Sequence, residues 1–203
     1  EKDGGLDNDL IVLFVNDFSV DKNLTFFNDT SQQVNIEIVE SCLGMFCGLV
    51  LNITIELEKG WNLISVPVMP INVSYPLQMD NGTAISVFAF QNKNWINITG
   101  GGLNSSMGVW VKAPHKGNIS ILGNKINATA WELGTGWHLR GYPYVTIQNI
   151  TGGMKNLTGW TADYGVFSFW NSSWSAFSPD RPETLNTLKN FQPARGYWIQ
   201  RKA

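Results

Sequence analysis

The chain has 203 residues, of which 43% are hydrophobic and only 15% are charged, and its formal net charge at pH 7 is −2. It is long enough for one large domain or for two to three small ones. It has no basic run, which argues against nucleic acid as a partner. Its longest apolar runs are far shorter than the roughly 20 residues that span a bilayer, so we expect no membrane-spanning segment.

The first 56 residues predict an N-terminal β-module, with strands near residues 10–15, 23–27, 33–40 and 49–57. The first of these strands is apolar at every position and consists of Leu10, Ile11, Val12, Leu13, Phe14 and Val15. A strand of this kind is buried on both faces. It is either a central strand of its own sheet or, because Gly4 and Gly5 precede it, an assembly strand donated to the sheet of a neighbouring subunit.

The two cysteines of the chain, Cys42 and Cys47, enclose a short segment that contains Gly44. In an oxidising compartment this spacing favours a disulfide that closes a small loop. In the chain-entropy model such a loop contributes roughly 2 kcal/mol. The spacing is not that of a C-x-x-C redox motif, and neither His115 nor His138 has a ligand-spaced companion for zinc. We therefore expect no metal site.

The strongest signal is the number of Asn-x-Ser/Thr sequons. Chance pairing of the 21 Asn with the Ser and Thr of this chain predicts about three sequons. The chain has twelve, at Asn23, Asn28, Asn52, Asn72, Asn81, Asn97, Asn104, Asn118, Asn127, Asn149, Asn156 and Asn171. Dense N-glycosylation would also explain the low charge, because sugars hydrate a surface that charged side chains otherwise hydrate.

Strand alternation places two of these sequons on a solvent face. In residues 49–57 every odd position is Leu or Ile, and Asn52 lies on the opposite face. Asn118 likewise alternates with Ile119 and Ile121. A strand that buries its isoleucines would therefore point both sequon side chains outward.

The rest of the chain is a tandem duplication of short strands separated by Gly, Asn and Pro. We predict repeat 1 over residues 57–128 and repeat 2 over residues 129–203. The duplicated aromatic positions match Trp61 with Trp137, Phe90 with Phe169, Trp95 with Trp174, and Trp110 with Trp198. Because these tryptophans recur in equivalent places, we expect them in a shared buried core layer. Any exposed aromatic platform is then expected at the unpaired Trp131, Trp160 and Trp170.

The predicted fold class is all-β, with β-sandwich or small-barrel modules arranged as two tandem repeats after the N-terminal module. No segment has a convincing helical period. The best candidate is Glu183–Asn190, which is one or two turns at most.

The repeat motif resembles a known module. The pattern begins with Gly-Trp-Asn-Leu-Ile-Ser-x-Pro, which stands at residues 60–67, continues with a Trp, and closes on Gly-Tyr-Trp, which stands at Gly196-Tyr197-Trp198 in repeat 2. It is similar to a β-rich module of secreted and surface-layer-associated proteins of bacteria and archaea. The likeness covers residues 57–114 and 131–201, and it implies an accessory surface module without a catalytic motif. Repeat 2 departs from it at His138 and at Arg140-Gly141. The density of sequons is also similar to that of glycosylated archaeal surface filaments.

No motif of a known catalytic arrangement is present, and we expect neither an enzyme nor a cofactor beyond covalent glycans. The carboxylates of Glu37, Glu40, Glu56 and Glu58 fall at outward strand positions or turns. The nine Trp and five Tyr leave carbohydrate binding as the main alternative.

The sequence thus predicts a non-enzymatic, N-glycosylated extracellular protein. We expect a homopolymeric filament subunit of an archaeal cell surface, with a pilus-like or thread-like assembly. The alternatives are a surface-layer component and an adhesin that binds sugars or other cells.

Overall fold

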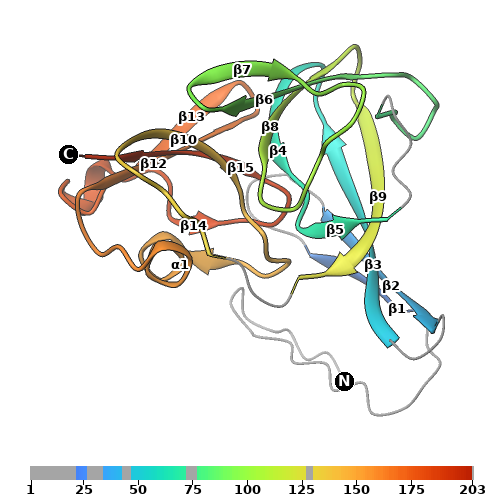
Figure 1. Ribbon diagram of the computed structural model, residues 1–203, viewed down its shortest axis with the longest axis horizontal. Helices are drawn as coiled ribbons and strands as arrows, with labels where there is room; N and C mark the ends of the chain where they lie inside the picture. The colour runs from blue at the N-terminus through green and yellow to red at the C-terminus, as the bar shows by residue number, and fades with distance from the viewer. Residues whose placement is uncertain (1–21, 27–33, 43–46, 72–76, 127–129, 203) are drawn as a thin grey trace.

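A computed structural model describes residues 22–26, 34–42, 47–71, 77–126 and 130–202. The described chain is mostly β, with several antiparallel sheets and one α-helix, which confirms the all-β fold class. Figure 1 shows repeat 2, in orange and red, beside repeat 1, in green and yellow, with the first strands below repeat 1. Among the described residues, no helix has the length and apolarity to cross a membrane.

The N-terminal strands join the first repeat in one five-stranded sheet, ordered β1-β2-β3-β9-β5. Its members are β1 (Lys22–Phe26), β2 (Val34–Cys42), β3 (Cys47–Leu57), β9 (Gly117–Lys125) and β5 (Val68–Pro70). Three of the four expected N-terminal strands are confirmed, and Leu10–Val15 lies outside the described residues. The expected boundary after residue 56 falls one residue before the end of β3, which pairs with β9 from Val50 to Leu57.

Two four-stranded sheets form the duplicated part of the molecule. The first is ordered β4-β8-β6-β7 and the second β10-β15-β12-β13. The first contains β4 (Gly60–Ser65), β8 (Gly108–Ala113), β6 (Ser86–Gln91) and β7 (Asn94–Asn97). The second contains β10 (Gly136–Gly141), β15 (Gly196–Arg201), β12 (Tyr164–Trp170) and β13 (Ser173–Phe177). The two sheets have the same strand order when each strand is matched to its sequence equivalent.

The inner face of the first sheet packs against the five-stranded sheet in an aliphatic core. Ile53 and Ile55 of β3, Ile119 of β9, and Val109 and Val111 of β8 are all fully buried there. The predicted alternation along β3 is confirmed, because Leu51, Ile53, Ile55 and Leu57 are buried while the residues between them are partly exposed. The core therefore lies between two sheets, as the strand pattern requires.

The inner face of the second sheet packs against a different layer, made of α1 (Ile150–Thr158), β11 (Gln148–Asn149) and β14 (Asn190–Phe191). Its core contains five buried aromatic side chains among its twelve buried members. Its largest fully buried members are Tyr142, Tyr164, Phe191 and Tyr197.

The expectation of no convincing helix is wrong at α1, whereas Glu183–Leu185 forms a single 3-10 turn. A pair such as Gly152-Gly153 is typical of a turn, but here Gly153 is needed inside the helix. A Cβ there would clash with the ring of Phe191. Asn149 caps the first turn by accepting a hydrogen bond from Gly152 N at 2.7 Å, and Gly159 ends the helix in the left-handed conformation.

Candidate functional site

The face of each four-stranded sheet that points away from its core is covered by aromatic side chains. In β6 the buried Val87 and Ala89 alternate with Phe88 and Phe90, which are only partly buried. We call the whole set the aromatic face. It comprises Trp61, Phe88, Phe90, Trp95 and Trp110 from repeat 1 and Trp137, Phe167, Phe169, Trp174 and Trp198 from repeat 2.

The first tryptophan of each repeat is positioned by the same local device. Gly60 and Gly136 precede Trp61 and Trp137 and have φ values of 102° and 104°, which only glycine adopts without strain. In repeat 1 the side chain of Asn62 accepts from Glu58 N at 2.9 Å and donates to Glu58 O at 2.8 Å. These bonds tie the strand to the turn before it.

Repeat 2 has a histidine in place of this asparagine, and the contact with the preceding turn is kept. His138 stands where repeat 1 has Asn62, and its Nε2 lies 2.9 Å from Gly134 O, the equivalent of Glu58 O. A histidine at this position therefore serves the same turn as the asparagine.

The ring contacts between the repeats are reciprocal. Trp110 lies 5.2 Å from Phe169, and the equivalent Trp198 lies 4.9 Å from Phe90. The same exchange relates the pair Trp110 and Trp174, at 6.1 Å, to the pair Trp198 and Trp95, at 5.9 Å. When residue i contacts j and its equivalent contacts the equivalent of j, the two units are related by an approximate two-fold axis.

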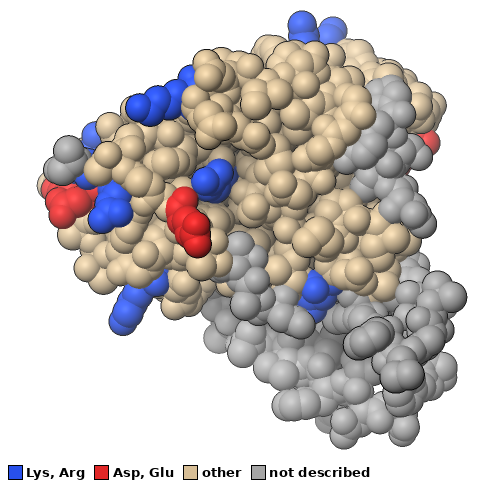
Figure 2. Space-filling model, in the orientation of Figure 1, with Lys and Arg blue, Asp and Glu red and all other residues tan. Residues whose placement is uncertain are grey.

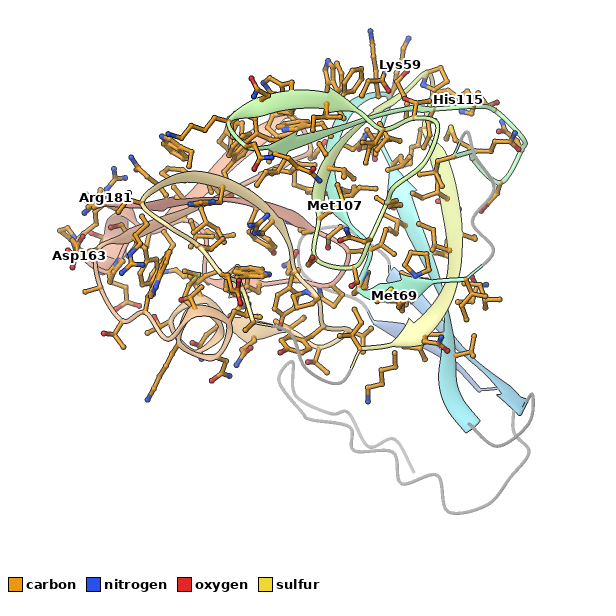
Figure 3. The ribbon with its side chains drawn as sticks, viewed as in Figure 1. Lys59, Met69, Met107, His115, Asp163 and Arg181 are labelled. Atoms are coloured by element: carbon orange, nitrogen blue, oxygen red, sulfur yellow. The ribbon has the colours of Figure 1, made fainter. Side chains whose placement is uncertain are left out.

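The backbone contacts where the repeats meet have the same reciprocity. Ser65 N donates to Ala194 O at 2.9 Å, and Gly141 N donates to Ser106 O at 2.9 Å. Met107 forms an isolated antiparallel β-bridge with Arg140. Figure 3 shows Met107 near the centre of the molecule, between the two repeats. The duplication thus behaves as a dimer within one chain.

The expectation that the paired tryptophans form a buried layer is wrong. Trp61 and Trp137 are equivalent, but they are 46% and 47% exposed. Trp95 and Trp174 are each 55% exposed. The expectation for the unpaired tryptophans is also wrong for one of them, since Trp131 is only 4% exposed.

The other two unpaired tryptophans are partly buried under arginine. Trp160 lies beneath the guanidinium of Arg201 at 4.3 Å, and Trp170 beneath that of Arg195 at 4.7 Å. Neither ring is therefore an open platform.

The aromatic face is hollowed into an open groove of about 560 Å³, which lies within the size range of small-molecule sites. We call it the aromatic groove. Every residue that lines it is aromatic: Trp61, Phe88, Trp95, Trp110, Phe169, Trp174 and Trp198. Figure 2 shows how sparse charged side chains are on the surface in view.

A second hollow, of about 450 Å³, adjoins Trp137 and has a polar lining that includes Gln91, Lys93, Glu132 and Arg140. Burial lowers the pKa of the Arg140 guanidinium from its ordinary value, although that group remains cationic at neutral pH. The hollow thus combines a half-exposed indole with several hydrogen-bonding side chains.

The sequon asparagines are accessible wherever their side chains are described. Asn52 is partly buried on the outer face of β3, and the others are exposed: Asn81, Asn97, Asn104, Asn118, Asn149, Asn156 and Asn171. Asn62 and Asn186 are buried at 3% and 6% exposure, and neither belongs to a sequon. Asn23 lies in β1, while Asn28, Asn72 and Asn127 lie outside the described residues.

Several sequons contain an internal hydrogen bond. In three of them the backbone N–H of the Ser or Thr donates to the asparagine Oδ1, at distances of 2.9 to 3.1 Å. These asparagines are Asn81, Asn97 and Asn104. The side-chain oxygen is then engaged locally.

The cysteines fall at facing ends of two paired strands. Cys42 ends β2, Cys47 begins β3, and the two are direct partners in the antiparallel register. Their side chains lie outside what the structure describes, so the disulfide remains a prediction.

Two of the carboxylates considered for catalysis are engaged in ion pairs. Glu56 and Glu58 lie 2.7 Å and 2.8 Å from Lys116 Nζ, and hydrogen bonds to them raise the pKa of that amine. Across the described ranges, no cluster of three or more His, Cys, Asp or Glu side chains is arranged to hold a metal ion.

Comparisons with protein-family models, with curated proteins and with solved structures found no match to this chain.

The class that the fold defines is an all-β protein with two pseudo-symmetric repeats that share an exposed aromatic face.

Proposed function

We propose that this chain is a non-enzymatic, N-glycosylated structural protein of an extracellular surface. The observation that carries the proposal is the placement of its asparagines. All eight sequon asparagines with described side chains are accessible, whereas the two asparagines that are buried among the described residues belong to no sequon. A glycan can be accommodated on the folded chain only where its asparagine reaches solvent, and all eight of these positions meet that requirement.

The low charge of the chain supports the same proposal. With 15% charged residues and a hydrophobic fraction of 43%, the bare surface has few groups to keep it soluble. Glycans at twelve sequons would supply that hydration. The resemblance of the repeat motif to a module of surface-layer-associated proteins, and of the sequon density to archaeal surface filaments, favours a cell-surface location.

Within this proposal, the protein is a subunit of an archaeal surface filament that assembles by donating Leu10–Val15 to the sheet of the next copy. The support is the apolarity of both faces of this segment and the glycine pair ahead of it. Sugars at many sites would leave little other surface for subunit contacts. A surface-layer lattice is the alternative assembly.

The decisive test of glycosylation is the intact mass of the native protein. We expect it to exceed the 22.6 kDa of the polypeptide by several kilodaltons, with glycopeptides at most of the twelve sequons. A mass equal to that of the unmodified polypeptide would contradict the proposal. Non-reducing peptide mapping of the same sample should find Cys42 bonded to Cys47.

The assembly step has its own test. Deletion of residues 1–15 should give soluble subunits that no longer polymerise, and a synthetic peptide of residues 1–15 should restore their thermal stability without restoring polymers. Normal polymerisation of the truncated protein would exclude strand donation by this segment and favour a surface layer.

A second candidate function, a carbohydrate-binding adhesin, is favoured by the aromatic groove. Exposed indole rings on a rigid sheet are the side chains on which sugar rings stack, since each presents a large apolar face. Titration of soluble oligosaccharides into the protein, followed by tryptophan fluorescence, tests this function. Saturable quenching that Trp174→Ala weakens would support it, and the absence of any spectral change would count against it.

A further inference from the structure

One sequon stands on the aromatic face itself. In β7, Trp95 and Asn97 are two residues apart and therefore point to the same face of the strand. The register pairs Trp95 with Phe90 and Asn97 with Phe88, and both phenylalanines belong to the aromatic face. Directly opposed residues in an antiparallel pair have Cβ atoms about 5 Å apart. The Asn97 amide therefore begins beside two residues that line the aromatic groove, Phe88 and Trp95.

This sequon is held firmly to the sheet. Thr99 N donates to Asn97 Oδ1 at 2.9 Å, and Val87 N donates to Thr99 Oγ1 at 2.9 Å. Ile98 N also donates to Val87 O at 2.9 Å. A sugar on Asn97 Nδ2 would therefore be attached to a fixed side chain, and less conformational entropy would be lost when it packed against the neighbouring rings.

The rings beside Asn97 have open surface that a sugar could cover. Trp95 is 55% exposed although its ring meets Phe90 at 5.4 Å and Trp198 at 5.9 Å. Trp61, which packs edge-on against Phe88 at 5.6 Å, is 46% exposed. A pyranose ring has one face of C–H groups and a rim of hydroxyls. It can bury indole surface and remain hydrated at its outer edge.

We propose that the N-glycan on Asn97 is an intramolecular ligand of the aromatic groove, with its first sugar residues packed over the indole of Trp95. The inference rests on the proposed function, because it requires that Asn97 carry sugar. It gives the exposed tryptophans of repeat 1 a covalently tethered partner.

Repeat 2 supplies an internal reference. Ala176 of β13, paired with Phe167, occupies the place that Asn97 has opposite Phe88. Trp174, the equivalent of Trp95, is also 55% exposed, but β13 contains no sequon asparagine, because the nearest one, Asn171, lies in the turn before that strand. The tethered sugar should therefore protect Trp95 and leave Trp174 open.

The experiment compares the chemical reactivity of these two indoles. Native glycosylated protein, its Asn97→Gln variant and its Asn118→Gln variant are treated briefly with N-bromosuccinimide, and oxidation at each tryptophan is measured by peptide mapping. Asn118 is the matched control because it is an exposed sequon on a strand, opposite Glu56 rather than an aromatic residue. The same three chains made without glycosylation correct for any direct effect of the substitutions.

We expect Trp95 of the native protein to be oxidised roughly threefold to tenfold more slowly than Trp174, the range that an aromatic stacking contact would give. The protection should disappear in Asn97→Gln and in the unglycosylated chain, and it should persist in Asn118→Gln. The melting temperature should also fall more for Asn97→Gln than for Asn118→Gln, and only when the chains are glycosylated.

Three results would count against these ideas, and they are distinguishable. Equal oxidation of Trp95 in Asn97→Gln and in the native protein, with Asn97 of the latter glycosylated, would overturn the glycan contact and leave the proposed function intact. The same holds if glycopeptides show sugar at other sequons but none at Asn97. A native protein with no sugar at any sequon would overturn the proposed function and this inference with it.

Discussion

The two four-stranded sheets have the same aromatic face but different layers behind them. Behind the sheet of repeat 1 lies the five-stranded sheet, and the core between them is aliphatic. Behind the sheet of repeat 2 lie α1 and the short β11–β14 pair, and the core there is built around tyrosine and phenylalanine rings. Alternate residues of a strand serve opposite faces, so a duplicated sheet can keep one face unchanged while the other adapts to a new partner.

The largest expected effect comes from removing the ring at the centre of the aromatic core. Phe191 is fully buried and contacts Tyr197 at 4.8 Å, Tyr142 at 5.2 Å and Trp131 at 5.8 Å. Phe191→Ala should lower the free energy of unfolding by about 3–5 kcal/mol. Urea denaturation measures this.

A milder change in the aliphatic core, Ile121→Val, removes one methylene group and should cost only about 0.5–1.5 kcal/mol. The near-ultraviolet circular dichroism of the aromatic side chains should change for Phe191→Ala and stay the same for Ile121→Val. If the valine substitution were the more damaging of the two, the aromatic core would not be the unit we describe.

Alkaline pH should destabilise repeat 2 before repeat 1. Burial raises the pKa of Tyr197 to about 12, whereas an unfolded tyrosine titrates near 10. Stability is therefore unaffected below about pH 10. Between about pH 10 and about pH 12 the unfolded chain loses a proton that the folded chain retains, so roughly 2–3 kcal/mol of stability is lost.

Burial also raises the pKa of Tyr142 and Tyr164 in the same core, which adds to the loss. The described aliphatic core of repeat 1 contains no tyrosine. Hydrogen exchange at increasing alkaline pH should therefore show α1 and β12 opening before β3 and β9. Simultaneous opening of both regions would contradict this order.

The two-fold relation between the repeats predicts equal effects at two glycines. A Cβ on Gly108 would lie 2.5 Å from Arg140 O, and one on Gly196 would lie 2.7 Å from Ile64 O. Each Gly→Ala change should cost about 1–3 kcal/mol, because a backbone atom must move. Gly134→Ala is the control, since a Cβ there meets nothing within 4 Å. Thermal melts of the three variants would reveal any asymmetry.

The smallest effects are expected on the aromatic face. Trp61→Ala and Trp137→Ala should each cost about 1–2 kcal/mol, less than a fully buried aromatic residue, because about half of each ring is already exposed. The two costs should agree, since the rings lie 5.6 Å and 5.3 Å from Phe88 and Phe167. A difference of more than about 1 kcal/mol, measured by chemical denaturation, would show that the repeats are not energetically equivalent.

Much of the strand pattern followed from local sequence. Alternation in residues 49–57 identified the buried Leu and Ile residues of β3, and the duplicated Gly-Trp motif identified β4 and β10 as equivalents. Period-two burial and positive-φ glycines depend on nearest neighbours in the chain, so a sequence can reveal them. The helix α1 was missed because its two glycines look like a turn until Phe191 is placed against one of them.

Which face of each sheet became core was decided only by tertiary structure. In β6 one face presents Val87 and Ala89 and the other Phe88 and Phe90, and both are apolar. The sequence could show that the tryptophans of the two repeats share an environment, but not that this environment is half open to solvent. That outcome depends on the layers behind the sheets. The five-stranded sheet covers the aliphatic side of the first four-stranded sheet, and α1 covers the tyrosine side of the second. The aromatic faces are left uncovered and contact each other across the two-fold axis.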